Sequence, residues 1–94
     1  MGMDELKKIY SDAWDAGIWI REWGPPPGGA GYLAAAGGVK KLKEAEKKLG
    51  KEIDHTKLEM LDCMNLGALP GVGKTRKEAC SAAVAAYKEY YNVP

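Results

Sequence analysis

The chain has 94 residues, of which 46% are hydrophobic, so it has room for one small domain with a core of its own. Fourteen basic residues against 13 acidic ones leave a formal net charge of +1. This balance excludes an overall field that attracts polyanions and, with it, tight non-specific coating of DNA. Any contact with nucleic acid must therefore come from a local patch, and a domain of this size gains stability by forming a homo-oligomer.

The first predicted element is a helix from about Asp4 to Glu22, because apolar residues recur there at steps of three and four. Its tryptophans, Trp14, Trp19 and Trp23, are separated by five and four residues, which rotates them by roughly 140° and 40° on a helix. At least one ring must then face away from the core seam. We interpret the three rings as a candidate interface for a second copy or another protein.

A connector follows, Gly24 to Gly29, whose prolines stop any helix. Tyr32 to Ala36 is predicted as a short helical turn, and Val39 to Leu49 as a charged helix that Gly50 ends. Lysines cover one side of this charged helix: Lys40, Lys41, Lys43, Lys47 and Lys48. Such a pattern is typical of a solvated face, and the alternative is a nucleic-acid surface.

Two further helices carry a capping-box pattern at their starts. The first runs from Thr56 to about Leu66, and the second begins at Thr75, with Glu78 three residues later, and continues to about Asn92. The segment from Gly50 to Gly71 has neither the length nor the β-branched alternation of three strands. We therefore expect an all-α fold over residues 1–94: a single bundle of about four helices with a Gly/Pro-rich connector and a C-terminal helical hairpin.

The segment between the last two predicted helices joins a Gly-X-Gly turn to a basic helix start. Close glycines can turn backbone N–H groups toward one point, and a helix N-terminus adds unpaired N–H groups and partial positive charge. The pattern predicts a phosphate site made of Gly71, Gly73, Lys74, Thr75, Arg76 and Lys77.

Leu66 and Leu69-Pro70-Gly71-Val72-Gly73, after a predicted helix, resemble the helix-hairpin-helix motif of DNA repair and recombination proteins. The resemblance implies that the N–H groups of Gly71 and Gly73, with Lys74 beside them, hold one DNA strand by its phosphates. It covers roughly a quarter of the chain. Where the motif has a small apolar residue four places after its second glycine, this chain has Lys77.

A second resemblance runs from Gly71 and Gly73 through Thr75, Arg76 and Lys77 to a set of alanines, Ala79, Ala82 and Ala83. These residues are similar to the start of the last helix in a double-stranded-RNA-binding domain. That domain has a first helix followed by three strands, and the resemblance implies that the basic residues at the start of the last helix clamp phosphates across the groove.

Ala68 to Thr75 also resembles the nucleotide-binding P-loop, with Ala68 in place of the first glycine. A P-loop follows a buried parallel strand in a large sheet, and no such sheet is predicted. Nucleotide binding is therefore not expected, and no cofactor is predicted.

Catalysis is not expected either. His55 stands beside Asp54 at a predicted helix start, and no nucleophile pairs with it. Cys63 and Cys80 are too few and too widely spaced for a metal site with His55, so no metal is predicted; they are interpreted as buried thiols, with a disulfide as the alternative. Charges near the start of the sequence and the lack of a long apolar run predict a cytoplasmic protein without membrane association.

These features favour a DNA- or RNA-binding protein that contacts the nucleic-acid backbone through the Gly-X-Gly turn and the basic helix start. The alternative is a small helical interaction or oligomerisation module, such as an inhibitor, adaptor or structural subunit, that binds no nucleic acid.

Overall fold

A computed structural model describes residues 2–25 and 29–94 of the chain. Over these residues the fold is α+β, not all-α as the sequence predicted, because three strands form an antiparallel sheet. The elements in chain order are α1 (Gly2–Asp15), β1 (Ile18–Trp23), β2 (Tyr32–Gly38), α2 (Val39–Leu49), the 3₁₀ turn η1 (His55–Lys57), α3 (Met60–Asn65), β3 (Leu69–Gly73) and α4 (Arg76–Tyr91).

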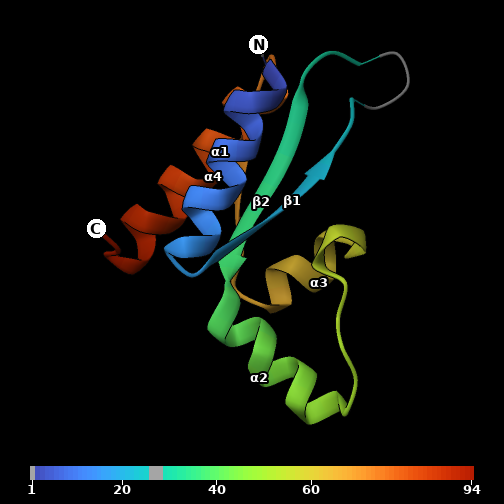
Figure 1. Cartoon of the computed structure of the whole chain (residues 1–94). Coiled ribbons are helices and arrows are strands. Elements are labelled where there is room, and N and C mark those ends of the chain that lie inside the picture. The colour runs from blue at the N-terminus through green and yellow to red at the C-terminus, as the bar shows by residue number, and fades with distance from the viewer. Residues whose placement is uncertain (1, 26–28) are drawn as a thin grey trace.

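The sheet has the order β1-β2-β3, and its two faces are covered by different parts of the chain (Figure 1). Ile18 pairs with Gly38 at one end, and Tyr32 pairs with Gly73 at the other. Helices α1 and α4 lie side by side on one face. The segment from α2 to α3, residues 39–65, covers part of the other face.

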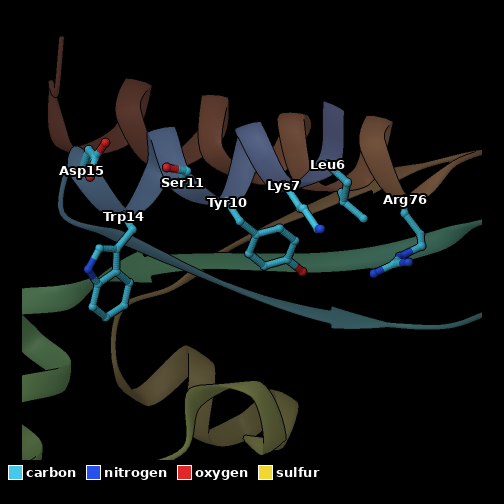
Figure 2. A pocket seen from close by; sticks show the side chains of 7 residues that line it. All are labelled: Leu6, Lys7, Tyr10, Ser11, Trp14, Asp15 and Arg76. Atoms are coloured by element: carbon cyan, nitrogen blue, oxygen red, sulfur yellow. The ribbon is translucent and has the colours of Figure 1, made fainter. Parts of the chain in front are cut away.

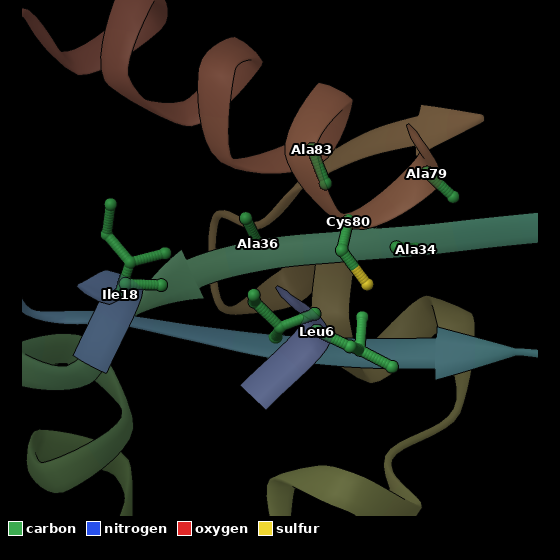
Figure 3. Packing of buried hydrophobic residues seen from close by; sticks show 9 residues of the cluster. Leu6, Ile18, Ala34, Ala36, Ala79, Cys80 and Ala83 are labelled. Atoms are coloured by element: carbon green, nitrogen blue, oxygen red, sulfur yellow. The ribbon is translucent and has the colours of Figure 1, made fainter. Parts of the chain in front are cut away.

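Between the sheet and the α1–α4 pair lies the first core, in which bulky residues of α1 and β1 meet small ones of β2 and α4 (Figure 3). Successive strand residues point to opposite faces, so Ile18 and Ile20 both face the helices. Ala34 and Ala36 of β2 are fully buried, and their small side chains let α4 approach the sheet closely. The buried residues of the first core are Leu6, Ala13, Ile18, Ile20, Ala34, Ala36, Ala79, Cys80 and Ala83.

The second core lies on the opposite face and is centred on Trp19, which packs with Ala35, Leu42 and Cys63. Trp19 Nε1–H donates to the carbonyl oxygen of Gly38 (3.1 Å), which satisfies the buried indole. A Cβ built on Gly37 would lie 2.3 Å from Trp19 Cζ2, so only glycine leaves room for the ring.

The first predicted helix was too long. Helix α1 ends at Asp15, Gly17 turns the chain with φ +82°, and the rest of the predicted helix is β1. The predicted helical turn at Tyr32–Ala36 is part of β2. Apolar residues at steps of three and four gave the first prediction, but Ile18, Trp19 and Ile20 are buried on both faces of the sheet, and the periodicity does not distinguish such a strand from a helix.

The predicted C-terminal hairpin of two helices is also wrong, because Leu69–Gly73 is the edge strand β3 and not a turn. Upstream, the helix predicted from Thr56 is replaced by η1 and the short α3. Its capping box does not form; the Asp54 side chain instead accepts the N–H of Thr56 (3.0 Å).

Two predicted helices are confirmed. Helix α2 spans Val39–Leu49 and ends at Gly50, whose φ of +72° gives the left-handed turn expected there. Helix α4 begins after Thr75 with both hydrogen bonds of the capping box to Glu78. Part of the predicted Gly/Pro connector, residues 26–28, lies outside the described residues.

Candidate nucleic-acid interface

A groove of about 520 Å³ runs along the exposed side of α1 and reaches the first residue of α4 (Figure 2). Its walls are mostly apolar, with Trp14 at one end and Arg76 at the other. The sequence predicted Trp14 as part of a protein interface and Arg76 as part of a phosphate site. The lining residues are Leu6, Lys7, Tyr10, Ser11, Trp14, Asp15 and Arg76.

Glu22 holds the Arg76 end of this groove in place. It follows Ile18 and Ile20 at two-residue steps along β1, so it faces the helices. Arg76 Nε–H donates to Glu22 Oε1 (2.7 Å), Arg76 Nη2–H donates to Oε2 (3.1 Å), and the Tyr10 hydroxyl donates to the same carboxylate. The hydrogen bonds that Arg76 donates to Glu22 raise the pKa of Arg76 above its ordinary value. The guanidinium is therefore charged and fixed in direction.

The other predicted cations lie close by. Lys77 Nζ is 2.9 Å from Glu5 Oε2, which ties the start of α4 to α1, and both side chains are about half exposed. Lys74 is exposed and has no ion pair among the described residues. The structure thus gathers Lys74, Arg76 and Lys77 at one end of the α1–α4 pair.

Several backbone N–H groups around the start of α4 already have an acceptor within the chain. Glu78 Oε1 accepts from the N–H groups of Lys74 (2.8 Å) and Thr75 (3.2 Å), and Thr75 Oγ1 accepts from the N–H of Glu78 (3.1 Å). A carboxylate of the chain therefore lies where an external phosphate would accept these hydrogen bonds. Phosphate contact at the N–H groups of Lys74 and Thr75 would have to displace Glu78, so the basic side chains are the main groups left for it.

Gly71 and Gly73 face α4. A Cβ on Gly71 would lie 2.2 Å from the backbone nitrogen of Ala83, and one on Gly73 would lie 2.7 Å from that of Ala79. The two glycines let the backbones of β3 and α4 come into direct contact. They stand two residues apart because residues at this spacing on a strand face the same side, here the helix. The spacing that predicted a phosphate turn has this packing role in the structure.

The three tryptophans have different environments. Trp14 is 47% exposed and stacks on His55, with ring centroids 5.9 Å apart. Trp23 is partly exposed, and Arg21 lies over its ring at 4.5 Å from the centroid. Trp19 is 1% exposed inside the second core, so its ring is not accessible to a binding partner. The predicted interface role stays a prediction for Trp14 and Trp23.

Cys63 and Cys80 are buried free thiols in different cores on opposite faces of the sheet. Burial raises the pKa of Cys80 to about 12, so its thiol is protonated at neutral pH. Across residues 2–25 and 29–94, no three side chains of His, Cys, Asp or Glu are grouped so that they could hold a metal ion. None of the helices described has the length and apolar content of a membrane span.

The sequence interpretation missed Glu22 and Glu5 as partners of the cations. The alternation of Ile18, Ile20 and Glu22 would have placed Glu22 beside the helices, had β1 been recognised as a strand. The P-loop resemblance also lacks its structural context, because β3 is an antiparallel edge strand. Searches with family models, among curated proteins and among solved structures find no match to this chain.

Proposed function

We propose that this chain binds the sugar-phosphate backbone of double-stranded RNA with the surface formed by α1 and the start of α4. The observation that carries the proposal is the position of the basic helix start in the fold. Lys74, Arg76 and Lys77 follow the last strand of an antiparallel sheet and adjoin the first helix. The double-stranded-RNA-binding domain that this segment resembles has a first helix, three strands and a last helix in that order. The same order is found here, with residues 39–65 between β2 and β3.

Duplex RNA is recognised mostly by its shape and by contacts to phosphates and 2′-hydroxyls, which suits this surface. Lys74 supplies a point charge, and the Nη1–H donors of Arg76, which Glu22 does not accept, suit a phosphate oxygen. The groove beside them adds the hydroxyl of Ser11 as a hydrogen-bond donor.

The ion pairs that Arg76 and Lys77 make within the chain do not prevent phosphate contact. Lys77 and Glu5 are both about half exposed, and such a pair contributes only ~0.2–1 kcal/mol in water, so a phosphate displaces Glu5 at little cost. The Arg76–Glu22 pair has two hydrogen bonds and a carboxylate that is only 17% exposed, so a phosphate shares Arg76 with Glu22 and does not displace it. Since the whole chain has a net charge of only +1, binding depends on this local patch and weakens steeply with added salt.

The test is a titration of a labelled RNA duplex of about 16 base pairs, a length suited to the resembled domain. Duplex DNA and single-stranded RNA of the same sequence are the competitors. The variant Lys74→Gln/Lys77→Gln removes two charges and spares the Arg76–Glu22 pair. Lys57→Gln/Lys88→Gln, in η1 and near the end of α4, is the control with the same change in net charge.

We expect the first variant to weaken duplex binding by at least about tenfold, since it loses two phosphate contacts, and the control to weaken it far less. Preference for single-stranded RNA, or equal loss in both variants, would contradict the proposal.

A second function, self-association, is favoured by one observation: the half-exposed Trp14 at the end of a mostly apolar groove. Large exposed rings next to apolar grooves are common in protein interfaces. Sedimentation of the wild type and of Trp14→Ala at micromolar concentration tests it. Self-association predicts a concentration-dependent mass that the variant loses; a wild-type monomer at every concentration would contradict it.

A further inference from the structure

Helix α2 has a second positively charged surface, which the proposed RNA contact at α4 does not use. Five lysines of this helix are exposed: Lys40, Lys41, Lys43, Lys47 and Lys48. Lys40, Lys43 and Lys47 follow one line along the helix, at steps of three and four residues. We call these five side chains the α2 lysine surface.

The acidic residues of α2 do little to neutralise this surface. Glu46 is partly buried, and its Oε2 accepts the backbone N–H of Ile53 (2.9 Å), so it stabilises the loop after the helix. Glu44 is then the one carboxylate of α2 on the exposed side. In the described part of the chain none of the five lysines has an ion pair, in contrast to Arg76 and Lys77.

The α2 lysine surface faces away from the α4 site. Leu42 packs in the second core, on the sheet face opposite α1 and α4, and the exposed lysines lie on the other sides of α2. Lys40 and Lys41 also line a pocket with Tyr87 and Tyr91, which lie near the end of α4 that is remote from Arg76. The two sites also belong to opposite ends of the sheet, because α2 continues from Gly38 whereas α4 follows Gly73, which pairs with Tyr32 (Figure 1). These ends are separated by roughly 20 Å of strand. The two basic surfaces therefore lie on opposite faces and at opposite ends of the sheet, so they can contact different duplexes.

We propose that the α2 lysine surface binds the phosphate backbone of a second nucleic-acid duplex, so that one chain bridges two duplexes. The inference rests on the proposed function for the first duplex. A row of unpaired lysines on a rigid helix fits a partner with regularly repeated negative charge, and a duplex backbone has this property.

A membrane surface fits less well. A helix that lies on a membrane inserts an apolar face among the lipids. In α2 most of the apolar side is turned inward, with Leu42 buried and Val39 packed against the second core, and only the last residue, Leu49, is a large exposed apolar side chain.

The experiment uses an immobilised RNA duplex, the full chain, and a second, fluorescent RNA duplex of a different sequence. Retention of protein on the first duplex and capture of the second are measured separately. The variant is Lys40→Gln/Lys43→Gln/Lys47→Gln. The matched control is Lys51→Gln/Lys57→Gln/Lys88→Gln, which lowers the net charge equally from positions outside α2.

We expect the wild type to capture the second duplex, and the α2 variant to stay on the first duplex within about twofold while capturing at least about tenfold less of the second. The control should capture as much of the second duplex as the wild type does. Failure of the wild type to capture the second duplex would overturn the inference. So would undiminished capture by the α2 variant, because bridging would then come from two copies joined elsewhere.

Two further outcomes separate this inference from the proposed function. If the α2 variant loses the first duplex as well, α2 is part of a single binding site and the bridging inference fails. If Lys74→Gln/Lys77→Gln leaves retention on the first duplex unchanged, the proposed function fails, whatever α2 does. Loss of binding to vesicles of anionic phospholipid by the α2 variant, with duplex capture intact, would assign the surface to membranes and overturn the inference.

Discussion

Arg76 and Glu22 are 54 residues apart in the sequence and share two hydrogen bonds, at 2.7 Å from Nε–H and 3.1 Å from Nη2–H. This pair joins the first residue of α4 to the edge strand β1, and Tyr10 of α1 donates to the same carboxylate. Glu22 therefore orients the guanidinium but also competes with any phosphate that approaches it.

Glu22→Gln is expected to strengthen binding of duplex RNA. The amide keeps an oxygen acceptor for Arg76 but removes the negative charge that competes with phosphate. Removal of a competing charge of this kind is worth up to ~1 kcal/mol, so the affinity should rise by up to about fivefold at low salt. Fluorescence anisotropy with a labelled duplex measures the change, and thermal melting checks that the fold is retained. Unchanged or weaker binding in a folded variant would show that Arg76 does not contact phosphate.

Gly71→Ala is expected to destabilise the fold. The new Cβ would lie 2.2 Å from the backbone nitrogen of Ala83 and 2.6 Å from its Cα, and backbone atoms cannot move aside as a flexible side chain does. Overpacking of this kind costs ~1–3 kcal/mol, which urea denaturation detects. Gly24→Ala is the matched control, because a Cβ there meets no atom within 4 Å. Equal denaturation midpoints for the two variants would refute close packing of β3 on α4.

Stability is expected to fall as the pH is lowered through the range in which histidine titrates. His55 lies between the rings of Trp14 and Trp19, and burial lowers its pKa below the ordinary 6.5, against the smaller opposing effects of Asp54 and Glu46. The unfolded chain then binds more protons than the folded one between the two pKa values, so the free energy of unfolding decreases as the pH drops below about 6.5.

Urea denaturation at a series of pH values around neutrality and below measures this dependence. His55→Gln should flatten the curve in that range, because the titrating imidazole is gone. An identical pH dependence in the wild type and the variant would exclude His55 as its source.

Cys80 is expected to resist alkylation in the folded chain. With a pKa of about 12 its thiol carries little thiolate at pH 7, and the side chain is fully buried. Mass spectrometry after brief treatment with iodoacetamide should find Cys63 and Cys80 unmodified, and both should react in urea. Rapid labelling of Cys80 without denaturant would contradict the packing of α4 on the sheet.

Local sequence patterns predicted the parts of the fold that local interactions determine. The capping box at Thr75 and the left-handed Gly50 depend on residues within one helical turn, and both are found as predicted. The strands were missed because their evidence is not local. Ala34 and Ala36 favour a helix by propensity, and they are buried in a strand because Ala79 and Ala83 of α4 pack on them.

Only the basic residues of the candidate site could be predicted from the sequence. The cluster at Lys74, Arg76 and Lys77 is contiguous in the sequence, so its presence at a helix start could be inferred directly. Its partners Glu5 and Glu22 come from α1 and β1, and a pattern along the chain does not reveal such distant contacts. The Gly-X-Gly spacing is ambiguous for a physical reason: two glycines two residues apart serve equally to expose N–H groups in a turn and to let a strand pack on a helix.

The salt dependence of duplex RNA binding is the most direct measure of phosphate contact at the start of α4. The quantity measured is the slope of a plot of the logarithm of the association constant against the logarithm of the salt concentration. On duplex DNA each phosphate that a lysine neutralises contributes about −0.9 to this slope, and we use the same value for duplex RNA. Loss of two contacts in Lys74→Gln/Lys77→Gln should therefore make the slope shallower by about two, while Lys57→Gln/Lys88→Gln keeps the wild-type slope. A slope that is equal in all three proteins, or no dependence on salt in the wild type, would contradict phosphate binding at the start of α4.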